Sequence, residues 1–196
     1  MKKLFEGLEE NDIVVTGNGS ACVVSFQAAE IKKGQRLFTN SGCASMGYGL
    51  PAALGACIAE GEKRVICLDG DGSLMMNLQE LQTIRYNNCN MKLFVLNNNG
   101  YHSIRQTQNN LFKNGLVGVC DGNGVNFPPF DKLADTFGFR YFKIDSLDGI
   151  EEKLQEVLNT DGPVLCEAIL DEAQNFAPKL SSKVLPDGKI VSPPID

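Results

Sequence analysis

The chain has 196 residues, of which 43% are hydrophobic and 21% are charged, as is typical of one globular domain. A net charge of −6 argues against a nucleic-acid partner, and no apolar stretch is long and unbroken enough to cross a bilayer. No signal-type apolar core follows the basic start Met1-Lys2-Lys3, so we expect a cytoplasmic protein with no membrane partner.

Apolar runs alternate with helical patterns along the chain. Strands are predicted at 13–15, 36–38, 65–68, 93–96, 140–144 and 164–169, and helices at 20–29, 50–59, 75–86, 129–137 and 150–158. Strands without polar alternation are buried on both faces. The pattern therefore predicts an α/β fold, a doubly wound parallel sheet with helices on both faces. We expect this domain to span residues 1–176 and an irregular tail to span 177–196.

The cysteines and the histidine give little support for a metal centre. There are seven cysteines, no two of them spaced as CxxC, so neither a disulfide framework nor a zinc site is favoured. His102 is the one histidine and cannot by itself form a histidine metal site or a catalytic triad. We expect it at the surface or at a helix cap.

Four polar, glycine-rich turns fall at predicted strand ends, at residues 17–20, 41–46, 70–73 and 97–100. Ligands of open parallel sheets bind beyond the carboxyl ends of the strands. Such turns expose backbone N–H groups, and a following helix N-terminus adds positive potential. Together they predict an anion site suited to phosphate, although no GxxxxGK[ST] lysine is present, so the site is not a P-loop.

Asp71 and Asn98 are the most informative pair of residues. They are 27 positions apart, about one strand–helix–strand unit. If their strands are neighbours, the strand ends lie roughly 5 Å apart, and a carboxylate and an amide oxygen face one space. With the carbonyl of Gly100, two phosphate oxygens and a water, these oxygens would complete the octahedron that Mg²⁺ prefers.

Two segments resemble a known family. The segment GDGSLMMNLQELQTIRYNNCNMKLFVLNNNGY is similar to the thiamine-diphosphate fingerprint, which opens with GDG and closes with NN. The segment SGCASMGYGLPAALGA resembles the diphosphate-domain loop of the acetolactate synthase and 2-oxoacid decarboxylase group. The resemblance extends from Ile13 to about Ile169 and implies the C-terminal, diphosphate-binding domain of a thiamine-diphosphate enzyme.

The resemblance also implies roles for individual residues. Mg²⁺ would be held by Asp71, Asn98 and the Gly100 carbonyl. Met46 would wedge beneath the thiazolium, and main-chain groups of Ala44 and Met46 would bind the pyrimidine edge. Tyr101 and Asn98 are expected to contact the cofactor as well, and Tyr101, His102 and Gln106 are the side chains expected closest to a substrate. The diphosphate would be held by donors at Asn18, Gly19, Ser20, Gly72 and Ser73.

The family activates its cofactor with a glutamate from a separate pyrimidine-binding domain, supplied across a dimer interface. The resemblance therefore implies no catalytic residue in this chain, a partner domain elsewhere, a homo-oligomer and a 2-oxoacid substrate. We expect an excised domain or one subunit of a split enzyme, inactive by itself.

Two alternatives stay open. Gly47, Gly49 and Ala52 satisfy GxGxxG/A, and Asp69 follows Gly49 by 20 positions, as in a nicotinamide-binding Rossmann domain. That fingerprint needs its strand to end at the first glycine, whereas eight residues separate Phe38 from Gly47. The second alternative is a non-catalytic module that binds thiamine diphosphate, whose sequence would look the same.

Overall fold

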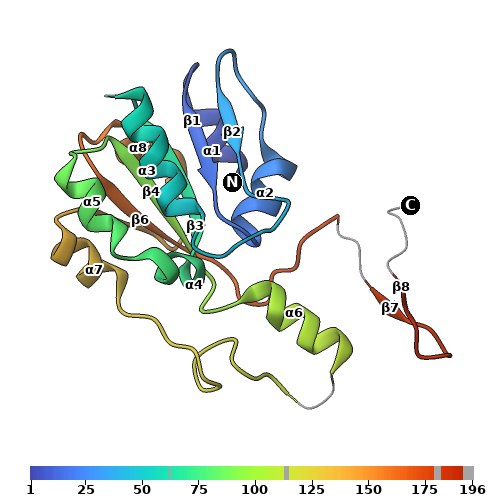
Figure 1. Ribbon diagram of the computed structural model, residues 1–196. Helices are drawn as coiled ribbons and strands as arrows, with labels where there is room; N and C mark the ends of the chain where they lie inside the picture. Colours follow the sequence, from blue (N-terminus) through green and yellow to red (C-terminus); the bar gives the residue numbers. More distant parts are fainter. Residues whose placement is uncertain (62, 113–114, 179–181, 192–196) are drawn as a thin grey trace.

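A six-stranded parallel sheet forms the centre of the computed structural model, which describes residues 1–61, 63–112, 115–178 and 182–191 (Figure 1). The strand order is β2-β1-β3-β4-β6-β5, and every neighbouring pair is parallel. This confirms the predicted doubly wound α/β fold. The strands are β1 (Ile13–Thr16), β2 (Arg36–Phe38), β3 (Val65–Gly70), β4 (Met91–Asn97), β5 (Arg140–Ile144) and β6 (Val164–Ile169).

Helices cover both faces of the sheet, which explains the continuous apolar strands. In β3, Val65 and Cys67 pack against one layer of helices and Ile66 and Leu68 against the other, and all four are fully buried. The first layer contains α3 (Gly49–Glu60), α4 (Asp71–Leu74), α5 (Glu80–Tyr86) and α7 (Phe130–Phe137). The second contains α1 (Lys2–Gly7), α2 (Ser20–Ala28) and α8 (Ile150–Asn159). Within the described residues, no helix is long and apolar enough to span a membrane.

The helix predicted at 75–86 is interrupted. After α4 the chain forms a 3₁₀ turn, η1 (Met75–Asn77), before α5 begins at Glu80. The backbone keeps helical dihedrals, but Leu81 and Gln82 donate to carbonyls three residues back rather than four. The Asn77 side chain at the end of this turn contacts a distant loop, since its Nδ2 donates to the Gly47 carbonyl at 2.7 Å. Helical spacing alone could not reveal this contact.

The tail is not wholly irregular. A two-stranded antiparallel hairpin, β7 (Lys183–Val184) and β8 (Ile190–Val191), stands apart from the main sheet in Figure 1. Its turn is Pro186-Asp187-Gly188, in which the Gly188 amide donates to the Leu185 carbonyl at 2.9 Å. Pro, Asp and Gly are the residues that such turns require. Residues 179–181 and 192–196 of the predicted tail lie outside the described residues.

The connections around β1 create the crevice where a ligand is expected. From β1 the chain runs through α2 to β2 on one side, and then through α3 to β3 on the other side of β1. Because α2 and α3 lie on opposite faces, β1 and β3 form a topological switch point, the usual ligand site of open α/β sheets. Helix α6 (His102–Leu111) lies beyond this edge of the sheet (Figure 1).

Candidate functional site

Three of the four glycine-rich turns meet at the carboxyl edge of the sheet, and the fourth contributes Met46. They form a pocket of about 90 Å³, called here the polar pocket. This volume is small for a ligand site, since such pockets usually measure about 300–1,000 Å³. The lining residues are Asn18, Gly19, Ser20, Met46, Gly70, Asp71, Gly72, Ser73, Leu96, Asn98, Gly100, Tyr101, His102, Ser103 and Ile104.

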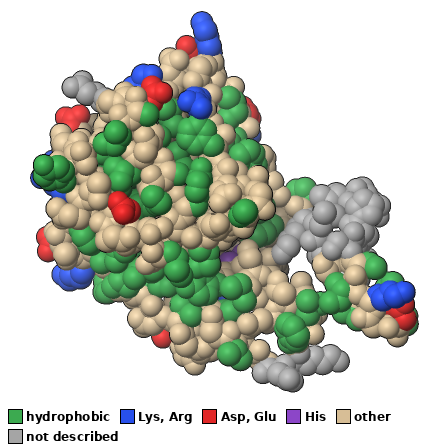
Figure 2. Space-filling model, viewed as in Figure 1, with side chains coloured by type: hydrophobic (Ala, Val, Ile, Leu, Met, Phe, Trp, Pro, Cys, Tyr) green, Lys and Arg blue, Asp and Glu red, His purple; other side chains and the backbone are tan. Residues whose placement is uncertain are grey.

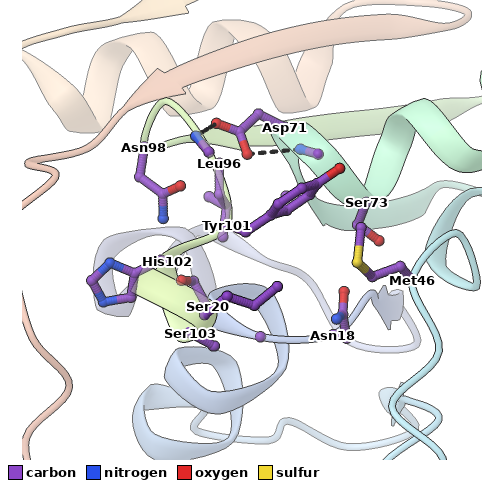
Figure 3. A pocket seen from close by; sticks show the side chains of 15 residues that line it. Asn18, Ser20, Met46, Asp71, Ser73, Leu96, Asn98, Tyr101, His102 and Ser103 are labelled. Atoms are coloured by element: carbon purple, nitrogen blue, oxygen red, sulfur yellow. Dashed lines mark hydrogen bonds between the residues drawn. The ribbon is translucent and has the colours of Figure 1, made fainter. Parts of the chain in front are cut away.

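Asp71 is a buried carboxylate held in place by backbone donors. It follows β3 and is 2% exposed. Its Oδ1 accepts from the Gly72 amide at 2.7 Å and its Oδ2 from the Gly100 amide at 2.9 Å (Figure 3). Burial raises its pKa to about 6, although these backbone hydrogen bonds oppose the shift. The negative charge is therefore costly here without a cation.

Asn98 faces the same space from the neighbouring strand. Gly70 at the end of β3 pairs with Leu96 in β4, so the turns that carry Asp71 and Asn98 leave the sheet side by side. Asn98 is 6% exposed, and its amide group extends into the pocket beneath Asp71 in Figure 3. A carboxylate oxygen and an amide oxygen at one site are the hard ligands that Mg²⁺ prefers.

The turn after β1 supplies the opposite wall of the polar pocket. Gly19 is the N-cap of α2 and has φ +58°, ψ −129°, a conformation open to glycine. Ser20 begins the helix, so free backbone N–H groups and the helix dipole face the pocket. A Cβ on Gly19 would lie 3.6 Å from Ser103 Oγ, which places the first turn of α6 close by. This wall suits an anion such as phosphate.

Met46 enters the pocket because its loop is fixed to the turn after β3. The Gly47 amide donates to Ser73 Oγ at 3.0 Å, and the Gly47 carbonyl accepts from Asn77. Ala44 is placed differently from the other expected site residues. It is exposed, its amide donates to the Asn40 carbonyl at 2.7 Å, and it does not line the polar pocket of the described chain.

Tyr101 covers the glycine that follows Asp71, and this packing gives a testable contrast. An added Cβ on Gly72 would lie 2.1 Å from Tyr101 Cε1, whereas on Gly70 it would meet nothing within 4 Å. We expect Gly72→Ala to lower the free energy of unfolding by about 1–3 kcal/mol. Gly70→Ala should stay within about 0.5 kcal/mol of the parent. Urea unfolding of both variants measures this.

A Tyr101→Ala background provides the control for that contrast. If the ring is what the new methyl group meets, Gly72→Ala should cost much less in this background, a coupling that a double-mutant cycle detects. Equal penalties with and without the ring would show that Gly72 is required for another reason.

His102 and Gln106 both contact the segment that follows β6, but only His102 lines the polar pocket. His102 is the first residue of α6 but is 6% exposed, with its ring edge-to-face on Phe176 at 5.2 Å. At this exposure the expected surface position is wrong, and the N-cap of α6 is Tyr101 rather than His102, which is visible at the bottom of a hollow in Figure 2. Gln106 does not line the polar pocket, and its Nε2 donates to Asn175. Both contacts reach residues about 70 positions away, which no local pattern reveals.

Beside the polar pocket lies a larger cavity of about 530 Å³ with mostly apolar walls from α1, α2, α8 and the strand ends. The two share Ser20, Leu96, Asn98 and His102 as lining residues. His102 therefore lies between a polar and an apolar space.

Sequence reasoning missed Arg105, which is buried at 7% exposure. Its guanidinium donates to the carbonyls of Asn98 at 3.1 Å and Asn99 at 3.0 Å. The available signal was its position on the helix directly after the asparagine turn, which is weak because most helical arginines are solvated.

The Rossmann alternative does not fit the structure. Asp69 is fully buried, and its Oδ1 accepts from the Gly70 amide at 3.0 Å. Added Cβ atoms on Gly17 and Gly49 would lie 2.1 and 2.7 Å from its carboxylate oxygens, so no room remains for a ribose. Strand β2 also ends at Phe38, well before Gly47.

Among the described residues, no group of three or more His, Cys, Asp or Glu side chains could hold a metal ion. A metal site here would therefore depend on one carboxylate together with amide, carbonyl and ligand oxygens.

Comparisons with known proteins agree on one family. Residues 17–168 match the family described as "Thiamine pyrophosphate enzyme, C-terminal TPP binding domain". The chain is similar to acetolactate synthase isozyme 1 large subunit of Escherichia coli, 30% identical over 87% of this chain and 30% of that protein. It is 32% identical to acetolactate synthase 1, chloroplastic, of Nicotiana tabacum, over 88% of this chain and 26% of that protein. It is 33% identical to acetolactate synthase isozyme 2 large subunit of Escherichia coli, over 91% of this chain and 32% of that protein. The chain thus spans about a third or less of the length of these relatives.

Proposed function

We propose, from the premise that this chain belongs to the thiamine pyrophosphate enzymes as a C-terminal TPP binding domain, that it binds the diphosphate of thiamine diphosphate through Mg²⁺. The enzyme it serves would be an acetolactate synthase-like carboligase or 2-oxoacid decarboxylase. One observation carries the proposal. Asp71 and Asn98 leave adjacent parallel strands and enter one pocket, opposite the N-terminus of α2.

The residues present fit a magnesium diphosphate. Burial disfavours the ionised Asp71 carboxylate, and a divalent cation would offset that cost. A single protein carboxylate suffices, because the diphosphate brings the remaining negative charge. Asp71, Asn98 and the Gly100 carbonyl would hold the metal. Asn18, Gly19, Ser20 and Ser73 would donate to the diphosphate oxygens, and Gly72, whose one N–H donates to Asp71 Oδ1, would lie against them.

The other lining residues would orient the cofactor. Thiamine diphosphate, when bound, supplies the carbon nucleophile for 2-oxoacid chemistry. Met46 stands on the side of the pocket facing away from Asn98 and would support the thiazolium (Figure 3). Main-chain groups of Met46, and of Ala44 if its loop moves toward the ligand, would bind the pyrimidine edge. Tyr101 would lie beside the diphosphate and keep water from it.

A pyrimidine-binding domain would complete the site. Among the described residues that line the polar pocket there is no glutamate, so the activating carboxylate would come from that domain. It would lie in the remainder of a longer chain or in a second subunit, and the assembly would be a homo-oligomer with its sites between domains. Two exposed apolar side chains at or beside the pocket, Met76 and Ile104, suit such an interface.

We expect the chain alone to catalyse no measurable decarboxylation or carboligation of 2-oxoacids. A missing acid–base group commonly costs about 10²–10⁴-fold in rate, and here half of the substrate site would be missing too. Turnover of pyruvate and other 2-oxoacids, assayed with saturating thiamine diphosphate and Mg²⁺, measures this. The control is the same assay after addition of the pyrimidine-binding domain of an acetolactate synthase.

Turnover that is restored by this addition would support the proposal that a pyrimidine-binding domain completes the site. Turnover by the chain alone at the usual enzyme range of about 1–10³ s⁻¹ would refute it. Cofactor binding without restored turnover would favour the second alternative, a non-catalytic module that binds thiamine diphosphate.

A further inference from the structure

The turn that carries Asn98 has an unfavourable backbone conformation. Asn99 has φ +56° and Gly100 has φ +138°, two successive residues in the region that side chains rarely adopt. An added Cβ on Gly100 would lie 1.9 Å from the Val119 carbonyl oxygen. Strained backbone of this kind persists where the surrounding structure holds it, and such places cluster at functional sites.

Arg105 is well placed to hold this turn. From the first turn of α6 its side chain reaches back, and one terminal nitrogen, Nη2, donates to both the Asn98 and the Asn99 carbonyls. The other, Nη1, donates to the Glu172 carbonyl at 3.1 Å and lies 3.8 Å from the Glu172 carboxylate. The guanidinium thus joins the two strained peptide groups to the segment that follows β6.

The geometry of these contacts requires an arginine. A planar guanidinium presents several donors in a fixed arrangement and can serve carbonyls on two sides at once. A lysine would keep the charge but could not hold both peptide groups and Glu172 in this way. The charge itself is partly balanced by Glu172, whose side chain is 52% exposed and also accepts from Asn99 Nδ2 at 3.0 Å.

We propose that Arg105 is a positioning residue, which fixes the asparagine turn so that the Asn98 side chain is held ready for the metal. The metal part of this inference rests on the proposed function of Asn98. The ordering of the turn does not, because every contact that carries it joins two groups of the chain itself.

The test compares Arg105→Met and Arg105→Lys with a matched control, Arg64→Met. Arg64 is also a poorly exposed arginine, with its side chain 12% exposed. Its Nε donates to Asp12 Oδ1 at 3.0 Å and its Nη1 to the Leu158 carbonyl at 3.3 Å. It precedes β3, so it lies at the opposite edge of the sheet. The control therefore loses the contacts of a poorly exposed arginine away from the pocket, and its acidic partner, Asp12, is more buried than Glu172.

Amide hydrogen exchange in the absence of cofactor is the first measurement. The amides of Asn99, Gly100 and Tyr101 donate to Asn97 Oδ1, Asp71 Oδ2 and the Val119 carbonyl, at 3.0, 2.9 and 2.8 Å. In both Arg105 variants their exchange should rise by at least about tenfold relative to the amides of β3 and β4, which report global unfolding. In Arg64→Met the ratio should not change.

Magnesium dependence is the second measurement. The Mg²⁺ concentration that half-saturates thiamine diphosphate binding should rise about 10–100-fold in both Arg105 variants, the usual cost of losing a group that orients a metal ligand. Arg64→Met should bind as the parent does.

Three results would overturn parts of this account. Exchange at the turn within about twofold of the parent in both Arg105 variants would show that the arginine does not order it. If Arg105→Lys matches the parent in exchange and Mg²⁺ dependence while Arg105→Met does not, the positive charge, not the guanidinium geometry, orders the turn. A parent chain that binds no cofactor with Mg²⁺ would overturn the proposed function and the metal part of the inference, whatever the exchange shows.

Discussion

Replacing Asp71 by alanine should abolish Mg²⁺-dependent binding of thiamine diphosphate and leave the chain folded. Among the described residues that line the polar pocket, Asp71 carries the one carboxylate that could bind the metal, and the substitution removes it. Loss of a group that merely orients a metal ligand costs about 10–100-fold, so loss of a charged ligand itself should exceed about 100-fold. Calorimetric titration of the cofactor in the presence of Mg²⁺ would measure this.

The fold should survive because two effects of similar size oppose each other. Without the carboxylate, the Gly72 and Gly100 amides lose their acceptors, at a cost of about 1–3 kcal/mol for each amide that stays buried without a partner. Against this, raising the Asp71 pKa from 3.8 to about 6 means that its ionised form costs the fold about 3 kcal/mol at neutral pH. Removing the carboxylate removes that cost as well.

Asp145→Ala is the matched control for Asp71→Ala. Asp145 also follows a strand of the sheet, at the end of β5, but its side chain is 53% exposed and 3.7 Å from Lys143. It should bind the cofactor as the parent does. If circular dichroism shows that Asp71→Ala unfolds the chain, Asp71 is structural. If that variant folds and binds normally, the metal-ligand role is wrong.

The fold could be predicted because its main determinants are local. The runs Val65–Leu68 and Leu93–Leu96 have no polar alternation, and the structure shows why, since helices cover both sides of β3 and β4. The spacing of Asp71 and Asn98 could be interpreted for the same reason. One helix between two parallel strands places their carboxyl ends together, and β3 pairs with β4.

The features that could not be predicted depend on contacts between distant parts of the chain. Arg105 and Gln106 bind residues of the segment after β6, and the His102 ring packs on Phe176. Sequence periodicity carries no signal for contacts across some 70 positions. Similarly, helical spacing cannot show the 3₁₀ turn after Leu74 or the bond from Asn77 at its end to the Gly47 loop.

Calorimetric titration of thiamine diphosphate into the unmodified chain, with Mg²⁺ and again with a chelator, tests the central claim most directly. In the proposed site, Asp71 and Asn98 would offer oxygen atoms to a diphosphate that also presents oxygen atoms, so a cation would lie between them. Binding should be measurable with Mg²⁺, though weak if a partner domain supplies part of the pocket, and undetectable with chelator. Equal affinity under both conditions would contradict the metal-bridged site.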